Sequence, residues 1–340
     1  MDTMKAWQYG SFNGNLEDSL TINPSIPLPT PSSLGKDKLL VKVISASINP
    51  VDYKLPESGI IGKLMVSLPA TPGLDFCGRI TAKHPSNETF QVGQLVFGGF
   101  NSSNQMGTLG EYTVISSQCC ALVPPGVSPN SAAAVGTAAT TAYQSLTSDT
   151  LQPGALVFIN GGSGGVGTWS VQLAKALGAN VVTTCSTHNV ELCQSLGADE
   201  VIDYKKVDVV THLRQKGPTF DLVIDNVGND PELYNQSDLF IKPGGTFVQV
   251  GVGEAVSFKG VALTIGKQLW PSILRSRKFY FVNMKNGTEC FQRIGGWMAE
   301  GKVKPVIAAE YRWEDVPEAF KKLREGHLSG KIVITVSVDA

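Results

Sequence analysis

Residues 155–167, with the sequence ALVFINGGSGGVG, combine an unbroken apolar run with a glycine-rich turn. The apolar run predicts a strand that is buried on both faces of a parallel sheet. The turn contains a G-x-G-x-x-G pattern at Gly162, Gly164 and Gly167, between this strand and a predicted helix over 166–177. In that setting the glycines allow a tight turn, close approach of backbone N–H groups to a pyrophosphate, and packing of the helix on the strand. The helix N-terminus adds a partial positive charge, so we predict a dinucleotide-binding loop rather than a glycine-rich turn without a ligand.

Strands and helices alternate along the chain after this loop. Further strands are predicted at 180–184, 200–202, 220–225 and 246–250, with helices at 190–196 and 208–216 between them. This alternation is typical of an open, doubly wound sheet, which places the segment in the α/β fold class.

The segments on either side follow a different pattern. Short strands at 39–44, 78–82 and 92–97 predict a small β-barrel in the first 125 residues, and the Ala-rich stretch 129–146 predicts a helix. Strands at 278–282 and 331–336 and helices at 290–300 and 316–324 are expected to return to the first domain. We therefore expect one domain from residues 1–126 and 273–340, and a dinucleotide-binding domain from residues 127–272.

Composition limits the classes of function. The 340 residues suggest about two domains, and 42% hydrophobic against 17% charged residues excludes a disordered chain. A net charge of −1 gives no basic surplus for a nucleic acid or an anionic membrane surface. The chain has no apolar run of membrane-spanning length and no pattern of a secretory signal, and its six cysteines are scattered. We therefore expect a cytoplasmic protein that binds neither a nucleic acid nor a membrane; the small-molecule substrate is expected from the chemistry described below.

The turn after the strand 180–184 bears on the choice of dinucleotide. A carboxylate there would accept hydrogen bonds from the ribose 2′-hydroxyl of NAD, but no Asp or Glu occurs before Glu191. The small side chains of Ser186 and Thr187 leave room for a 2′-phosphate, which favours NADP(H). The alternative for these two residues is ordinary turn chemistry.

Several short motifs occur in order along nearly the whole chain: INPVDYK at 48–54, PGLDFCG at 72–78, TTAY at 140–143, the glycine loop at 160–167, LGAD at 196–199 with VIDY at 201–204, and GKIV at 330–333. In this order and spacing the chain resembles the zinc-independent medium-chain dehydrogenase/reductases, in particular quinone oxidoreductases and enone (enoyl) reductases. The resemblance implies a GroES-like β-barrel catalytic domain, built from both ends of the chain, beside a Rossmann cofactor domain. It also implies either a homodimer or a monomer.

The same resemblance implies a set of cofactor contacts. They are Pro50, Thr141, Ser163, Gly164, Gly165, Val166, Ser186, Thr187, Asn189, Tyr204, Asn226, Val250, Gly251 and Lys331. Tyr204 is expected against the adenosine or its 2′-phosphate. Members of the family often carry Lys or Arg near 189–190, to hold the 2′-phosphate. This chain has Asn189 and Val190 there, so it departs from the family at one position that bears on the expected preference for NADPH over NADH.

No metal site is expected. Where alcohol dehydrogenases of this superfamily hold catalytic zinc, this chain has Asn49, then Gly73-Leu74-Asp75, then about Thr137. A catalytic zinc needs three protein ligands, and at most one plausible ligand remains here.

The predicted chemistry is transfer of a hydride from NADPH to a conjugated acceptor: a quinone, an enone, an enal or an enoyl double bond. Tyr53 and Asn49 are candidate donors to the developing enolate oxygen, and Tyr53 is also a candidate donor of the final proton. Tyr53 could instead only line the cleft, and Asn49 could only orient its loop. The segment 98–110 is expected to be a lid over the cleft or a plain surface loop.

Two other functions stay open. One is a stand-alone, trans-acting enoyl reductase of a polyketide or secondary-metabolite pathway. The other is a non-enzymatic relative of the crystallin or RNA-binding kind, against which the balanced charge and the intact glycine loop both argue. Segments 60–68 and 269–284 are expected to shape the substrate pocket.

Overall fold

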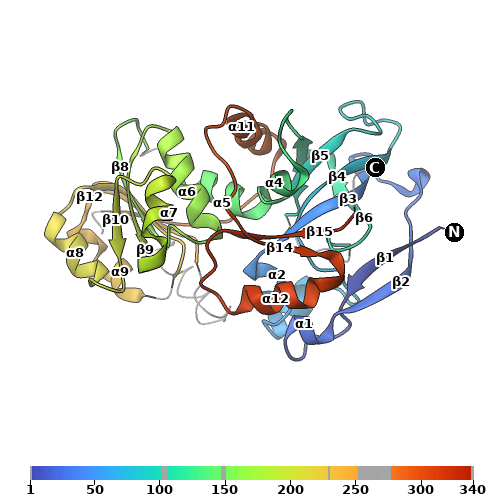
Figure 1. Cartoon of the computed structure of the whole chain (residues 1–340), viewed down its shortest axis with the longest axis horizontal. Helices are drawn as coiled ribbons and strands as arrows, with labels where there is room; N and C mark the ends of the chain where they lie inside the picture. The colour runs from blue at the N-terminus through green and yellow to red at the C-terminus, as the bar shows by residue number, and fades with distance from the viewer. Residues whose placement is uncertain are drawn as a thin grey trace. The chain divides into compact units, whose positions relative to one another are not determined.

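The computed structural model describes residues 2–101, 106–146, 151–228, 230–251, 266 and 277–337 (Figure 1). Residues 102–105 of the expected lid and residues 269–276 of the expected pocket wall lie outside these ranges. The chain divides into unit 1, residues 1–140 with 285–340, and unit 2, residues 141–284. Both dividing points lie further along the chain than the boundaries expected from the sequence.

Unit 2 contains a six-stranded parallel sheet with the order β10-β9-β8-β11-β12-β13. The strands are β8 (Leu156–Asn160), β9 (Asn180–Cys185), β10 (Glu200–Asp203), β11 (Phe220–Asp225), β12 (Ile241–Gln249) and β13 (Lys278–Phe281). The first strand in sequence, β8, lies between β9 and β11, so the strand order reverses beside it. Ligands of open α/β sheets bind at such a reversal, outside the carboxyl ends of the strands.

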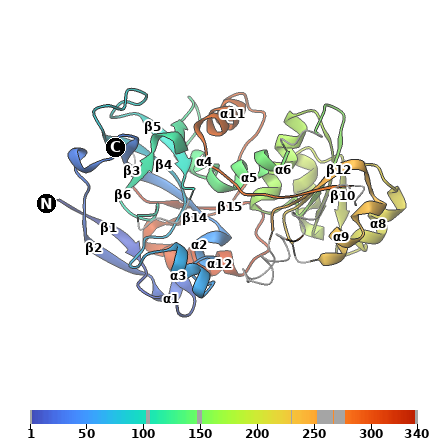
Figure 2. The same ribbon diagram turned by 180° about the vertical axis from the view of Figure 1, so that it is seen from behind.

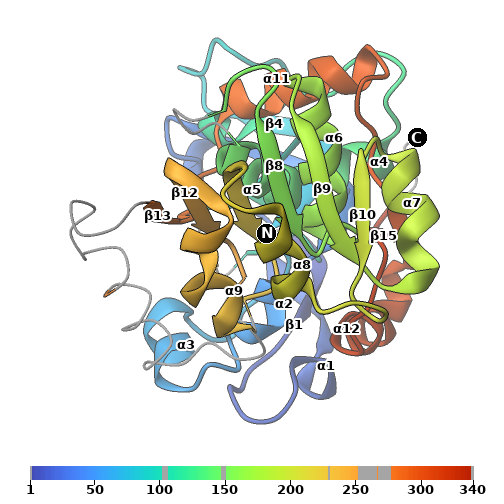
Figure 3. The same ribbon diagram turned by 90° about the vertical axis from the view of Figure 1, so that its left-hand side faces the viewer.

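Helices cover both faces of this sheet, as Figures 1 and 3 show. Helices α6 (Gly165–Ala176) and α7 (Val190–Ser195) contact β8, β9 and β10, and α8 (Val209–Lys216) and α9 (Pro231–Asn235) lie on the other face. Side chains of α8 and α9, among them Leu213 and Tyr234, pack with Phe158 and Phe247 of the sheet in one buried cluster. Burial on both faces explains why these strands are continuous apolar runs.

Unit 1 is built on a seven-stranded sheet with the order β14-β15-β3-β4-β5-β7, in which β6 also pairs with β3. The strands are β3 (Lys38–Ile48), β4 (Asp75–Lys83), β5 (Leu95–Gly99), β6 (Tyr112–Ser116), β7 (Cys120–Leu122), β14 (Ile307–Arg312) and β15 (Lys331–Thr335). A separate antiparallel pair is formed by β1 (Thr3–Gln8) and β2 (Thr21–Pro27). Segments from both parts of the chain thus share one sheet, because β15 pairs antiparallel with β3.

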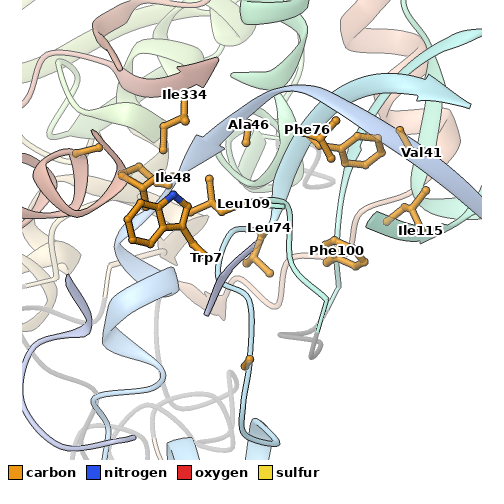
Figure 4. Close-up of a cluster of buried hydrophobic side chains, with 14 of the residues drawn as sticks. Trp7, Val41, Ala46, Ile48, Leu74, Phe76, Phe100, Leu109, Ile115 and Ile334 are labelled. Carbon is orange, nitrogen blue, oxygen red and sulfur yellow. The ribbon is translucent and has the colours of Figure 1, made fainter. Parts of the chain in front are cut away.

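Figure 4 shows the apolar core of unit 1. Trp7, Ile48, Phe76, Leu109 and Ile334 gather there from segments far apart in the sequence, and each is less than one-tenth exposed. The helices of this unit are α1 (Leu16–Ser19), α2 (Pro50–Lys54), α3 (Ile60–Met65), α4 (Pro129–Ala133), α11 (Thr288–Ala299) and α12 (Val316–Arg324). The structure confirms the mixed α/β fold with a barrel-type sheet and a doubly wound sheet. Among the described residues, no helix has the length and apolar character needed to cross a membrane.

The helix predicted over 129–146 is interrupted. It forms as α4 and a separate helix α5 (Gly136–Leu146). The Asp75 carboxylate lies at the start of α5, where it accepts hydrogen bonds from the backbone N–H and the hydroxyl of Thr137, both at 2.7 Å. A Cβ atom on Gly136 would collide with this carboxyl group. The second helix therefore begins at a buried anionic cap that the composition of the segment did not reveal.

Phe158 tests the packing of the parallel sheet. It is fully buried and meets Phe220 edge to face, with ring centroids 5.8 Å apart. We expect Phe158→Ala to lower the free energy of unfolding by about 3–5 kcal/mol, because it removes apolar area and leaves a cavity. Leu239→Ala, at a side chain that is 47% exposed, should change it by less than about 0.5 kcal/mol. Chemical denaturation monitored by circular dichroism measures both, and equal losses would contradict the assignment of Phe158 to the core.

Candidate functional site

The glycine loop of unit 2 combines closely packed glycines with an open one, and its tight turn, with φ +78°, is at Gly161 rather than at Gly162. A Cβ atom on Gly162 would collide with the Thr183 side chain, and one on Gly167 would collide with the backbone of Gly161. Both glycines are therefore needed for packing of the loop itself. Gly164 differs, because the nearest atom to its ideal Cβ is the Gly161 carbonyl oxygen at 3.7 Å. The loop thus leaves space beside Gly164, at the N-terminus of the twelve-residue helix α6.

Three polar side chains at the carboxyl ends of neighbouring strands hold this loop. The Thr184 hydroxyl accepts a hydrogen bond from the Gly161 N–H at 2.8 Å and donates to the Asn160 side chain at 2.7 Å. The amide of Asn160 in turn donates to Asp225 at 2.9 Å. None of these three residues was predicted from the sequence. Their signal was present, because each stands at or next to the end of an apolar strand.

The buried Asp225 carboxylate also orders the next turn. It accepts the backbone N–H groups of Val227 and Gly228, each at 3.0 Å. The backbone carbonyl of Asp225 accepts the N–H groups of Val250 and Gly251, at 2.9 and 3.1 Å. The predicted cofactor contacts Asn226, Val250 and Gly251 are therefore brought together at the ends of β11 and β12.

Asn226 carries an unsatisfied polar group. Its side-chain oxygen and nitrogen are both shielded from water, and neither has a hydrogen-bond partner among the described residues. Shielded amides of this kind normally have partners, so the pair suits a ligand that both donates and accepts. Together with the open space at Gly164, this fits a dinucleotide laid along the strand ends.

Further predicted contacts gather around the turn after β9. The Asn189 amide donates to the hydroxyls of Ser163, at 3.3 Å, and Ser186, at 3.2 Å. Ser186 also lies 3.2 Å from the imidazole of His188. The adjacent Thr187 is exposed. These contacts link the glycine loop to the turn in which a 2′-phosphate was expected.

Tyr204 follows β10 and is 39% exposed. The ammonium group of Lys205 lies over its ring, 5.4 Å from the centroid. The neighbouring Asp203 carboxylate accepts the Lys205 N–H at 3.0 Å and lies 3.5 Å from the Lys206 ammonium. Two cationic side chains therefore accompany the Asp203 carboxylate, and Asp203 pairs with Cys185 just before the turn after β9.

In unit 1, the INPVDYK segment leads into a buried polar cluster. The Lys331 ammonium is 3% exposed and donates to the Ile48 carbonyl at 3.0 Å and to the Asn49 side-chain oxygen, and it lies 3.5 Å from Asp75. The Asn49 amide donates to Asp75 at 2.7 Å, and Ser47 donates to the same oxygen at 3.1 Å. Both ends of the Asn49 amide are therefore engaged by protein groups.

Lys331 was expected to contact the cofactor, and that contact stays a prediction. Three protein oxygens already surround its ammonium group, which has three protons to donate. Burial lowers the pKa of Lys331, and the carboxylates of Asp75 and Asp52 oppose this effect. The visible role of this lysine is therefore to neutralise buried carboxylates within unit 1.

The positions that correspond to zinc ligands in the related alcohol dehydrogenases come together in this cluster. Asn49 and Thr137 both bind Asp75, and a lysine ammonium lies beside them. Among the residues that the structure describes, no three His, Cys, Asp or Glu side chains are grouped so that they could hold a metal ion. An amide, a hydroxyl and one carboxylate, already bonded to one another, form a poor donor set for zinc.

Tyr53 lies on the short helix α2, and its side chain is 9% exposed. Its hydroxyl has no hydrogen-bond partner among the described residues. Burial raises the pKa of Tyr53, the nearby Arg324 guanidinium lowers it, and Glu57 and Glu17 raise it. Of the remaining predicted contacts, Pro50 is exposed at the start of α2, and Thr141 is buried on α5.

Asp52 makes the stability of unit 1 depend on pH. Burial, followed by the negative charge of Asp75, raises the pKa of Asp52 from its usual 3.8 to about 7. Between these two values the folded protein holds a proton that the unfolded chain has lost, so the free energy of unfolding falls as the pH rises through this window. We expect Asp52→Asn to remove that decline, so that the variant gains stability relative to the original protein more at pH 8 than at pH 5.

Urea denaturation at the two pH values measures this difference. Asp37→Asn is the matched control, because hydrogen bonding from Ser116 lowers the pKa of Asp37 and its contribution is lost only on acidification below the usual pKa of 3.8. That variant should show no added pH dependence between pH 5 and 8. A parallel pH profile for Asp52→Asn and the original protein would contradict the raised pKa.

Comparison with known families and proteins supports the same interpretation. Residues 35–125 match the family model described as alcohol dehydrogenase GroES-like domain, and residues 196–334 match the model described as zinc-binding dehydrogenase. The first match lies within unit 1, and the second includes strands and helices of both units.

Individual relatives match over nearly the full chain. The trans-enoyl reductase pgmF of Aspergillus terreus is 42% identical, over 98% of this chain and 96% of its own length. The chloroplastic NADPH-dependent alkenal/one oxidoreductase of Arabidopsis thaliana is 31% identical, over 97% and 79%. The solved structure of the quinone oxidoreductase from Coxiella burnetii superposes with a TM-score of 0.83 at 27% identity, covering 98% of this chain and 99% of that one. The chain therefore belongs to the medium-chain dehydrogenase/reductase superfamily of nicotinamide-dependent oxidoreductases, in its zinc-independent group of quinone and enoyl reductases.

Proposed function

We propose that the protein transfers a hydride from NADPH, without a metal ion, to a conjugated acceptor. The acceptor is a quinone, or a carbon–carbon double bond that is conjugated to a carbonyl, as in an enone, an enal or an enoyl group. The observation that carries the proposal is the loop at Gly164, which leaves space for an anion at the N-terminus of α6 while the glycines on either side of it are closely packed. The relatives named trans-enoyl reductase, alkenal/one oxidoreductase and quinone oxidoreductase support the class of acceptor.

Bound NADPH would supply a hydride from its nicotinamide ring. The backbone of Ser163, Gly164, Gly165 and Val166 would bind the pyrophosphate. Asn226, whose two side-chain polar atoms have no partner among the described residues, would bind groups near the nicotinamide end, where Val250 and Gly251 also lie. These residues fix the position of the reductant, which is the main contribution a protein makes to hydride transfer.

The preference for NADPH is proposed from the turn after β9. Ser186 and Asn189 present a hydroxyl and an amide there, with Thr187 exposed beside them. The ammonium group of Lys205 over Tyr204 and that of Lys206 beside Asp203 place positive charge near the Asp203 carboxylate. A 2′-phosphate would find donors and cations in this region, whereas residues 186–190 themselves contain no carboxylate for a free 2′-hydroxyl.

Tyr53 is the proposed donor to the substrate. Its hydroxyl has no partner among the described residues, so it is available to the oxygen on which negative charge develops, or to the carbon that takes up the final proton. Asn49 is proposed to hold the INPVDYK segment rather than touch the substrate, because both ends of its amide are hydrogen-bonded within unit 1.

The 42% identical relative also supports the narrower alternative of a stand-alone enoyl reductase that acts on a carrier-bound chain. A carrier-bound substrate extends beyond the reacting double bond. Higher kcat/KM for a pantetheine thioester of an enoyl group than for the corresponding free enone would favour this alternative.

A spectrophotometric screen of NADPH oxidation tests the proposed reaction. We expect activity with quinones, 2-alkenals and cyclic enones, none with saturated aldehydes, and no inhibition by 1,10-phenanthroline. Tyr53→Phe should lower kcat about 100-fold, in the range expected for loss of a general acid. Activity on saturated aldehydes alone, or inhibition by the chelator, would refute the proposed reaction, and full activity of Tyr53→Phe would refute the proposed donor.

Gly164→Val tests the phosphate loop separately from folding. The backbone of Gly164 has φ −74° and ψ 177°, which any residue adopts, and its Cβ position is open. We expect the free energy of unfolding to change by less than about 1 kcal/mol, and the affinity for NADPH, measured by fluorescence titration, to fall at least about tenfold because the side chain occupies the space of the phosphate. Gly10→Val, where the added Cβ meets nothing within 4 Å, is the control and should leave affinity unchanged. Unchanged affinity of Gly164→Val would exclude this loop as the phosphate site.

A further inference from the structure

A cluster of three charged side chains lies next to the ring of Tyr53. It consists of Glu17 from α1, Glu57 after α2, and Arg324, the last residue of α12. Figures 1 and 2 show these three helices side by side in unit 1, and both α1 and α2 contact α12. None of the three charged residues was singled out in the sequence, because each lies far along the chain from at least one of its partners.

Arg324 is held at both ends of its guanidinium group. Its Nε and Nη2 donate to the two oxygens of Glu17 at 2.7 and 2.8 Å, in the parallel geometry that suits an arginine and a carboxylate. Nη1 donates to Glu57 at 2.9 Å, and Nη2 also donates to Glu57. Glu57 additionally accepts the backbone N–H of Leu16 at 2.7 Å, which attaches α1 to the same group.

The guanidinium group lies against the Tyr53 ring. Its central carbon is 4.3 Å from the ring centroid, the distance of a close cation–π contact. A free arginine on a surface would sample many positions, but here two carboxylates fix the plane of the group. The fixed Arg324 guanidinium group therefore packs against one face of the Tyr53 ring and restrains its rotation.

The ring and the hydroxyl of Tyr53 therefore lie in different environments. The ring is buried and covered by the cation, whereas the hydroxyl has no protein partner among the described residues. We infer that Arg324 is a positioning residue, which holds Tyr53 so that its hydroxyl is presented to the substrate and which balances the charge left on Tyr53 after it has given up its proton. This inference rests on the proposed function of Tyr53 as the proton donor.

The proton balance shows why a cation is useful at this place. Bound NADPH would supply a hydride to the β-carbon of the conjugated acceptor and would become NADP⁺, which would leave the acceptor as an enolate with one negative charge. Transfer of the hydroxyl proton from Tyr53 to the enolate completes the saturated product and leaves a tyrosinate, which water then reprotonates. Glu17 and Glu57 raise the cost of that tyrosinate, and Arg324 lowers it. Arg324, Glu17 and Glu57 are the charged groups that act on Tyr53 from α12, α1 and the end of α2.

A double-mutant cycle on kcat tests the inference. Removing Arg324 alone would leave Glu17 buried without its partner, so the pair is replaced together in Arg324→Gln/Glu17→Gln. We expect this change to lower kcat about tenfold when Tyr53 is present and less than about twofold in a Tyr53→Phe background, because its effect passes through the hydroxyl. The KM for NADPH should stay the same. Arg324→Lys, which keeps the charge and loses the planar fork, gives a second route through the cycle if the double variant does not fold.

A second measurement does not depend on turnover. The protein has eight tyrosines, and uniform labelling with 3-fluorotyrosine gives a ¹⁹F signal for each of them. The fluorine makes the phenol more acidic, which brings its titration to lower pH. The signal of Tyr53 is the one that is lost in Tyr53→Phe. We expect Arg324→Gln/Glu17→Gln to move the titration midpoint of Tyr53 upward and Glu57→Gln to move it downward. Arg312→Gln is the matched control, because Arg312 pairs with Asp315 and is 77% exposed, and it should leave the midpoint and kcat unchanged.

The outcomes separate the two proposals. Equal losses of kcat in both backgrounds, with an unmoved ¹⁹F midpoint, would make Arg324 a purely structural residue and overturn the inference while the proposed reaction stands. Failure of the original protein to oxidise NADPH with any conjugated acceptor would remove the proposed reaction. The ¹⁹F titration would then still decide whether Arg324 controls the ionisation of Tyr53.

Discussion

A lysine ammonium buried among oxygens holds unit 1 together where distant parts of the chain meet. Lys331 from β15 reaches the end of β3 at Ile48 and Asn49 and the start of β4 at Asp75. Asp75 then caps helix α5 through Thr137. A buried charge is tolerated only when it is paired and hydrogen-bonded, so each of these groups requires the others. The INPVDYK segment, which carries Tyr53, is anchored on this arrangement through Asn49.

Unit 2 depends on a different constraint, which is steric. The loop between β8 and α6 passes so close to β9 and to its own backbone that side chains are excluded at Gly162 and Gly167. Asn160, Thr184 and Asp225 then satisfy the backbone at the strand ends. At Gly164, in contrast, a Cβ atom would have no close contact. The contrast between packed glycines and an open one separates the part of the motif that builds the loop from the part left for a ligand.

Much of unit 2 could be predicted from the sequence, because parallel strands are short apolar runs and the intervening helices end at glycines. The strand Phe220–Asp225 and the helix Val316–Arg324 form with the predicted limits. The strands β1, β2, β6 and β14 were not predicted, since they are half-exposed and owe their structure to pairing with distant neighbours. The glycine loop was found by its local spacing. The contacts of the Lys331 ammonium and of the Arg324 guanidinium could not be predicted in this way. Lys331 lies 282 residues from Asn49, and Arg324 lies 267 residues from Glu57 and further from Tyr53.

The position of β15 has a consequence for how the protein acquires its structure during synthesis. This strand lies between β14 and β3, in the interior of the unit 1 sheet, yet it follows all of unit 2 along the chain. A polypeptide emerging from the ribosome therefore exposes β3 and its apolar neighbours until the whole inserted unit has been made. Early collapse of unit 2 shortens the loop that must be closed and brings the two flanks together. Nascent unit 1 is consequently the part with the longest exposure to chaperones and to aggregation.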